Sequence, residues 1–386
     1  MKLIYSTNMW THHQMPIATE LAKILGPDQF KMAVFEEISD ERREMGWGEK
    51  ANRPWLIGPP SDLSGMQALL KECIDADVMI LGACPQKIMK TRIATGKLTL
   101  VAAERMLKKP FHHLRMLNPR YAMGIRRYRT LVTYPHVYAL AIGHYAPGDL
   151  RMIGAFEKRI LQWAYFVEQP TTLPKMPPAR PLKLLWVGRM LALKRVDLLL
   201  KAVDLLRDTG CIGKCLIVGD GPERKRLLKL ARRLNLTPNF VQFVPPVAFS
   251  KVRYLMREAD AYVLSSNRHE GWGAVAGEAM AEGCILVANE AAGAARVLVQ
   301  DGETGLLFRD GDEEQLAEQL KKLNSDYSLR MRIRKQAWEQ MQALWHPRVA
   351  AERLVVLCKS LIGRSNLPSY TTGPCSIVTG INNQRK

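Results

Sequence analysis

Short apolar runs alternate with longer amphipathic stretches along most of the chain, and this pattern predicts a repeated strand and helix unit. A helical period over 16–25 follows the first apolar run directly. Strands that alternate with helices are typical of a doubly wound α/β sheet with parallel strands. In the first half, we expect strands at 3–6, 30–36, 78–83, 98–109, 138–143 and 161–168.

The same alternation begins again at residue 182, after a segment in which regular structure is not expected. Residues 170–181 contain five prolines in twelve positions, which neither a strand nor a helix tolerates. We therefore predict a first domain at 1–169, a linker at 170–181 and a second doubly wound domain at 182–345. The expected strands of the second domain lie at 182–189, 215–220, 240–246, 261–266, 284–292 and 305–308.

The 386-residue chain has a formal net charge of +19, and the charge is concentrated in one stretch. Between residues 87 and 129 there are twelve Lys and Arg against one acid, Glu104. This basic stretch is either a solvated surface or a face that attracts an anionic membrane, a lipid phosphate or an acidic glycan. Nucleic acid is not an expected partner, because Tyr121 and Tyr128 form no regular stacking pattern.

Cysteine usage and the first residues indicate a reducing compartment. The seven cysteines are odd in number and scattered, which argues against a disulfide framework. The first ten residues lack the features of a signal peptide, and no run of eighteen apolar residues follows. We expect a cytoplasmic protein, with a peripheral position at the inner membrane face as an option. No metal site is expected. We expect Cys211 and Cys215 to be buried apolar thiols, not metal ligands. Residues 75–77 are expected to form a junction between a helix and a strand, not a metal-binding triplet.

The segment from Glu270 to Glu278 carries the most specific chemistry of the sequence. On one helix, an eight-residue spacing would separate the two carboxylates by about 80° and about 12 Å, too far to share one proton or one metal ion. They therefore suit two different parts of one long ligand, such as the sugar and the ribose on either side of a diphosphate. A helix that starts near Ala274 would offer unpaired N–H groups to the negative charge between them. Between the carboxylates stand Gly271, Trp272, Gly273, Ala274 and Val275.

Four motifs of the second half resemble those of the retaining GT-B glycosyltransferases of family four: VGRMLALKR, VGDGPE, EGWGAVAGEAMAEG and DGETGLLF. The resemblance covers roughly residues 182–345. It implies that Glu270 contacts the donor sugar, that Glu278 contacts the nucleotide ribose, and that Arg189 and Lys194 bind the diphosphate. Backbone around Gly273, Ala274 and Val275 should complete the donor site, together with Gly188 and Gly219.

The resemblance also implies two facing nucleotide-binding domains and a C-terminal helix at 346–363 that crosses back to the first domain. Residues 364–386 lack apolar periodicity and read as a flexible tail. The first half resembles the family less, because His12 and His13 replace its glycine-rich loop and Glu104 stands where many members have a histidine. Since the carboxyl ends of parallel strands bind ligands, we place His12, His13 and Arg105 at the acceptor cleft. For the histidines, a helix cap and an exposed side chain are the alternative. Glu104 acts at the reacting sugar or forms an ion pair with a neighbour.

Together these patterns predict an enzyme that transfers a hexose from a UDP-sugar or GDP-sugar to a hydroxyl of a glycan or lipid-linked acceptor. The resemblance implies retention at the anomeric carbon, no metal, and a place in surface-polysaccharide synthesis. A sugar-nucleotide epimerase or a phosphorylase on the same fold is the alternative enzyme. A non-catalytic subunit that binds sugar nucleotides is the alternative outside catalysis. An NAD-binding fingerprint is not supported, because GDGPER lacks the third glycine.

Overall fold

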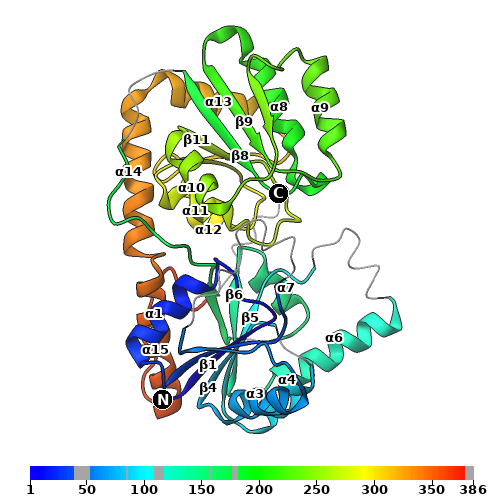
Figure 1. The fold of residues 1–386 in the computed structure, drawn as a ribbon, viewed down its shortest axis with the longest axis vertical. Coiled ribbons are helices and arrows are strands. Elements are labelled where there is room, and N and C mark those ends of the chain that lie inside the picture. The colour runs from blue at the N-terminus through cyan, green and yellow to red at the C-terminus, as the bar shows by residue number, and fades with distance from the viewer. Residues whose placement is uncertain (39–52, 84–85, 108–116, 157, 176–180, 379–386) are drawn as a thin grey trace. The chain divides into compact units, whose positions relative to one another are not determined.

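The computed structural model of the chain describes residues 1–38, 53–83, 86–107, 117–156, 158–175 and 181–378. The chain divides into two compact units. Unit 1 contains Met1–Arg43, Trp47–Val167 and Leu344–Lys386, and unit 2 is formed mainly by Glu168–Ala343. Both units are built from strands and helices that alternate along the chain (Figure 1).

Unit 1 contains a parallel sheet in the order β3-β2-β1-β4-β5-β6-β7. Its strands are β1 (Leu3–Thr7), β2 (Phe30–Val34), β3 (Leu56–Ile57), β4 (Val78–Leu81), β5 (Leu98–Ala103), β6 (Val137–Ile142) and β7 (Ile160–Trp163). Its helices are α1 (Met15–Leu25), α3 (Leu63–Asp75), α4 (Gln86–Ala94), α6 (Pro119–Val132), α7 (Ala146–Met152) and α15 (Pro347–Gly363). The predicted strands are confirmed, but β5 and β7 end earlier than expected, and the short β3 was not predicted.

One cation of the basic stretch lies inside unit 1 instead of on its surface. Arg92 is fully buried and donates hydrogen bonds to the carbonyl oxygens of Ile74 (2.8 Å) and Leu98 (2.8 Å). Burial lowers the pKa of its guanidinium to about 10. Through these hydrogen bonds, Arg92 links the end of α3 to the start of β5, and it does not contribute to a charged face.

The tail after α15 extends the sheet of unit 1 as far as it is described. Cys375 N–H donates to the carbonyl of Gln162 (2.9 Å), and Gln162 N–H donates to the carbonyl of Ser376 (2.8 Å). Leu161 and Ile377 form an antiparallel bridge, so the tail pairs with the edge strand β7. The expectation of a flexible tail is therefore wrong for residues 375–378, because backbone pairing needs no apolar periodicity.

Unit 2 contains a second parallel sheet, in the order β10-β9-β8-β11-β12-β13. Its strands are β8 (Leu182–Val187), β9 (Ile212–Val218), β10 (Val241–Val244), β11 (Ala261–Leu264), β12 (Ile285–Asn289) and β13 (Leu306–Phe308). Its helices are α8 (Val196–Leu205), α9 (Arg224–Arg233), α10 (Phe249–Glu258), α11 (Val275–Ala281), α12 (Ala295–Leu298), α13 (Glu313–Ser325) and α14 (Tyr327–Ala343). All six predicted strands are present, and a doubly wound sheet in each half is confirmed.

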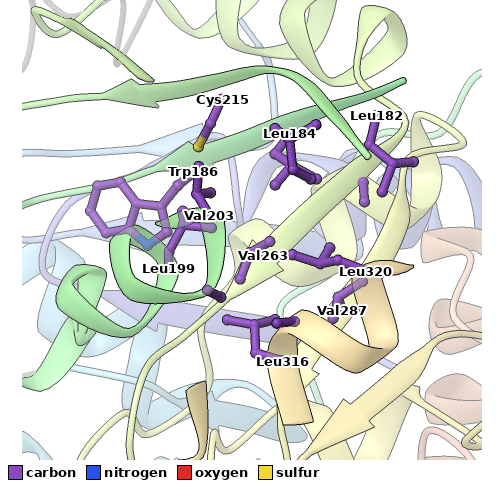
Figure 2. Packing of buried hydrophobic residues seen from close by; sticks show 14 of the residues in the cluster. Leu182, Leu184, Trp186, Leu199, Val203, Cys215, Val263, Val287, Leu316 and Leu320 are labelled. Atoms are coloured by element: carbon purple, nitrogen blue, oxygen red, sulfur yellow. The ribbon is translucent and has the colours of Figure 1, made fainter. Parts of the chain in front are cut away.

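The core of unit 2 lies between this sheet and its helices, as Figure 2 shows. Trp186 from β8 and Val263 from β11 belong to one buried cluster with Leu199 of α8 and Leu316 of α13. Each such side chain contributes about 1.5–3 kcal/mol when it is buried. Cys215 belongs to the same cluster, and burial raises the pKa of its thiol to about 12. It therefore packs as a protonated apolar group, as the sequence indicated.

Candidate functional site

Two glycines allow the loops after β8 and β9 to meet at the carboxyl edge of unit 2. The Gly188 N–H donates to the carbonyl of Val218 (3.0 Å), and the Met190 N–H donates to the carbonyl of Asp220 (2.7 Å). A Cβ atom on Gly219, whose φ is +130°, would lie 2.0 Å from the Gly188 oxygen. Only glycine fits such backbone contact. Gly188 and Gly219 therefore shape the edge from which Arg189 and Lys194 project.

The loop after β8 places two cations at this edge. The Ser265 hydroxyl donates to the carbonyl of Lys194 (2.7 Å), so the loop is tied to the end of β11. Lys194 also forms an ion pair with Glu270, and only 18% and 14% of the two side chains are exposed. The Arg189 side chain is exposed, and no described acid forms an ion pair with it. Unit 2 thus pairs two of the predicted site residues, Lys194 and Glu270, and carries Arg189 in the same loop as Lys194.

The segment that follows Glu270 is held by the loop after β12. A Cβ atom on Gly293 would lie 1.9 Å from the Gly271 oxygen, and Ala294 N–H donates to the carbonyl of Trp272 (2.9 Å). Trp272 is 3% exposed, so its ring is packed inside the unit. Gly293 was not identified from the sequence, although its place soon after a predicted strand was a usable signal.

The second predicted glutamate lies on α11, which starts at Val275 after the N-cap Ala274, as the sequence indicated. Glu278 is in the first turn of this helix and is 6% exposed. Glu270 precedes the helix, and its N–H donates to the carbonyl of Asn267 (3.0 Å). The two carboxylates therefore project from different elements, a loop and a helix.

Asn289 at the end of β12 is a further polar residue at this edge that sequence reasoning missed. It is fully buried, and its side-chain amide donates to the Asp310 carboxylate (2.7 Å). Its side-chain oxygen accepts from the Ala291 N–H (2.9 Å). Asn289 therefore fixes the start of the loop that carries Gly293. A polar residue that ends an apolar strand was the available signal.

In unit 1, four residues form a cluster beside the end of β1. The rings of His12 and His13 are 3.9 Å apart between centroids, and the His13 ring is 5.8 Å from that of Tyr165. The Tyr165 hydroxyl donates to the Glu104 carboxylate. Burial, and then the charge of Glu104, raise the pKa of Tyr165 well above its ordinary value. Tyr165 was missed, although it lies in a predicted strand.

Arg105 has a structural role in unit 1 that the sequence did not indicate. Its guanidinium lies 3.5 Å from the Asp149 carboxylate and 4.3 Å above the centre of the Tyr145 ring. The same carboxylate accepts from the Leu107 N–H (2.8 Å). These contacts hold the segment after β5 against α7.

Other parts of the basic stretch are exposed on unit 1. Lys90 lies on α4, and Arg120, Arg126 and Arg129 lie on α6 beside the exposed Met123. Lys108 and Lys109 fall outside the described residues. Among the helices that are described, none has both the length and the apolar character to cross a bilayer.

Comparison with known proteins matches residues 174–340 to the family "Glycosyl transferases group 1". The chain is 33% identical over 150 residues to the uncharacterized glycosyltransferase MJ1069 of Methanocaldococcus jannaschii, covering 39% of this chain and 38% of that protein. It is 33% identical over 187 residues to the D-inositol 3-phosphate glycosyltransferase of a Nocardioides species, covering 45% and 40%. The matched regions thus span about two fifths of these relatives' length.

Solved structures resemble the chain over a greater length. The crystal structure of Anabaena Alr3699/HepE in complex with UDP superposes with a TM-score of 0.67 at 18% identity, covering 94% of this chain and all of that one (100%). The apo form of the lipopolysaccharide outer core galactosyltransferase WaaB gives 0.63 at 16% identity, with 94% and 99% covered. At such identities the likeness shows the fold alone. It confirms the predicted GT-B fold.

Proposed function

We propose that this chain, whose unit 2 carries a group 1 glycosyltransferase domain, is a retaining glycosyltransferase. It moves a hexose from a nucleotide-diphosphate sugar to a hydroxyl of a glycan or lipid-linked acceptor. The Lys194–Glu270 ion pair at the carboxyl edge of unit 2 supports the proposal, because Arg189 lies in the same loop as Lys194 and the helix of Glu278 follows Glu270. Ligands bind at this edge in doubly wound sheets.

Arg189 and Lys194 neutralise the diphosphate in this proposal. When the bond between the anomeric carbon and the diphosphate oxygen breaks, the leaving group gains negative charge. Cations that are already in place stabilise that charge more in the transition state than in the bound donor, which accelerates the reaction. The Arg189 guanidinium is exposed and forms no ion pair with a described acid, so it is available for this contact. With two cations present, the proposed reaction needs no metal ion.

The two glutamates divide the rest of the donor between them. Glu278 accepts hydrogen bonds from the ribose hydroxyls, and Glu270 orients the sugar and favours the positive charge that develops at its anomeric carbon. Backbone N–H groups around Gly273, Ala274 and Val275 complete the diphosphate contacts. The acceptor oxygen then bonds to the anomeric carbon on the face that the diphosphate leaves, and its proton passes to a diphosphate oxygen.

A UDP-hexose is the donor that we favour over a GDP-hexose. The Anabaena protein of similar fold was crystallised with UDP and with UDP-glucose. The WaaB structure is that of a galactosyltransferase of the lipopolysaccharide outer core. These relatives support a role in surface-polysaccharide synthesis for this chain.

Unit 1 receives the acceptor in this proposal. His13, Tyr165 and Glu104 form its polar cluster at the carboxyl ends of the strands, where a sugar hydroxyl can be hydrogen-bonded. His12 and Arg105 lie in the same loops. The exposed cations of the basic stretch support a further part of the proposal, in which the protein binds an anionic membrane or a lipid phosphate at the inner face of the cytoplasmic membrane.

A panel of UDP-sugars and GDP-sugars tests the proposal. The pure protein is incubated with each donor, and release of the nucleoside diphosphate is measured with and without a lipid-linked or glycan acceptor. We expect turnover with a UDP-hexose that the Arg189→Ala variant loses. Binding of no sugar nucleotide in the panel, by a folded protein, would contradict the proposal.

A further inference from the structure

Helix α9 of unit 2 presents a one-sided charge that the proposed reaction does not use. Its ten residues include six Lys and Arg and no acid. Leu227 and Ala231 are buried in the core of unit 2, and Leu230 and Leu234 pack partly against that core. The apolar side of α9 therefore faces the sheet, and the charged side faces away from it.

Four of the cations share one face of this helix. At 100° per residue, Lys225, Lys229, Arg232 and Arg233 fall within an arc of about 100°, and they extend along about 12 Å of the helix axis. All four side chains are exposed. We call these four residues the α9 ridge. In Figure 1, α9 lies beside α8 at the outer side of unit 2.

The α9 ridge has no acidic partner among the residues that the structure describes. The two other cations of the helix are paired, since Arg224 lies 3.9 Å from Asp220 and Arg226 forms an ion pair with Glu223. No acidic side chain in the described part of the chain forms an ion pair with any member of the ridge. Like charges on one helix face repel each other, so an external anion stabilises this arrangement.

We propose that the α9 ridge docks onto an anionic phospholipid surface and gives unit 2 a membrane contact separate from the basic stretch of unit 1. Four charges spread over about 12 Å suit an extended anionic surface better than a single small anion. The helix exposes no large apolar side chain. It therefore lies against headgroups without insertion, and it lacks the apolar centre typical of protein interfaces. The absence of aromatic residues from α9 disfavours single-stranded nucleic acid, which binds by base stacking.

Vesicle binding by matched variants of the full chain tests this contact. In the ridge variant, Lys225, Lys229, Arg232 and Arg233 are changed to Gln. The control variant loses the same net charge from exposed positions on α10, α13 and α14: Lys251→Gln, Lys321→Gln, Arg332→Gln and Lys335→Gln. Because unit 1 can bind the same vesicles, both sets are also made in a background with Arg120, Arg126 and Arg129 changed to Gln.

Binding to phosphatidylcholine vesicles with and without phosphatidylglycerol is measured at low and high salt. Each cation at an anionic surface contributes about a fivefold increase in partitioning. We therefore expect the ridge variant to lose about tenfold or more in both backgrounds, on anionic vesicles only, and the control variant to lose much less. Thermal unfolding checks that each variant is folded, and a double Lys229→Gln, Arg233→Gln variant replaces the ridge variant if it is not.

Two results would overturn the inference. One is equal binding of the ridge variant and the control variant to anionic vesicles. The other is a loss of RNA binding in the ridge variant while vesicle binding is kept, which would assign the ridge to nucleic acid. Both results leave the donor chemistry of unit 2 untouched, because the ridge residues take no part in it.

Discussion

Lys194 has two anionic partners in the proposed site. It forms an ion pair with Glu270, and in the proposed mechanism it also neutralises the donor diphosphate. Arg189 lacks such a partner among the described residues, so its whole charge is available to the donor. In the proposed mechanism both cations therefore act on the diphosphate, but Lys194 starts from an ion pair with Glu270 and Arg189 does not.

Loss of either cation is expected to slow transfer strongly. Arg189→Ala and Lys194→Ala each remove a charge that, in the proposed site, faces the leaving diphosphate. The loss of transition-state stabilisation, calculated from the fall in kcat/KM, should be about 2–4 kcal/mol. Lys214→Ala is the matched control, because Lys214 is exposed near the other end of β9. Steady-state kinetics with the best donor measures the effect. Wild-type kinetics in both site variants would remove the pair from the mechanism.

We expect substitutions of Glu270 and Glu278 to have different effects on ligand binding and turnover. Glu270→Gln removes the counter-ion of Lys194, so the free nucleoside diphosphate should bind more tightly while turnover falls. Glu278→Ala removes the ribose contact, so the diphosphate and the intact donor should both bind about tenfold more weakly.

Calorimetry with the nucleoside diphosphate, beside turnover with the donor, separates the two roles. Glu318→Ala on α13 serves as the control, because this carboxylate is exposed. Weaker diphosphate binding in Glu270→Gln would show that Glu270 does not compete for Lys194.

At the scale of elements, apolar runs were sufficient to predict the sheets, because buried parallel strands consist of little else. Strand β3 was not predicted, because two residues are too few to show a hydrophobic period. The contact of Gly293 with Gly271 joins loops that are distant in sequence, and no local pattern encodes such a contact. Glu270 and Glu278 were found because their motif is contiguous. Tyr165 was not found, because its partner Glu104 follows a different strand, β5.

The tail pairing offers a test of an element that the sequence concealed. Deletion of residues 370–386 removes three backbone hydrogen bonds to β7 and the buried Cys375. At about 1 kcal/mol for each hydrogen bond, the free energy of unfolding of unit 1 should fall by about 2–4 kcal/mol. Deletion of 379–386 alone is the control. Urea unfolding curves that coincide for both deletions would contradict a structural role for 375–378.

At the scale of the whole molecule, the two units differ in how well sequence describes them. The family match covers residues 174–340, whereas a solved structure at 18% identity has a similar fold over 94% of this chain. A fold survives such divergence because volume and patterning are enough to maintain a core. The proposed acceptor site in unit 1 depends on particular loops, so the acceptor could not be identified from pattern alone.

The proposed reaction of the whole enzyme should not depend on a metal ion. In the proposed mechanism, Arg189 and Lys194 supply the positive charge that a divalent cation could otherwise supply. Turnover should therefore be unchanged after treatment with EDTA. Loss of turnover that magnesium or manganese restores would assign part of that charge to a bound metal.

We propose that unit 2 cleaves a sugar nucleotide with retention at the anomeric carbon. Proton NMR of the first minutes of the reaction with an α-linked UDP-hexose and an acceptor tests it most directly. The anomeric signal of the new product should have the coupling constant of an α-linked sugar while UDP accumulates, and the Lys194→Ala variant should show neither change. A product that first appears as the β anomer, or a donor that stays intact in the presence of folded enzyme and acceptor, would contradict this account.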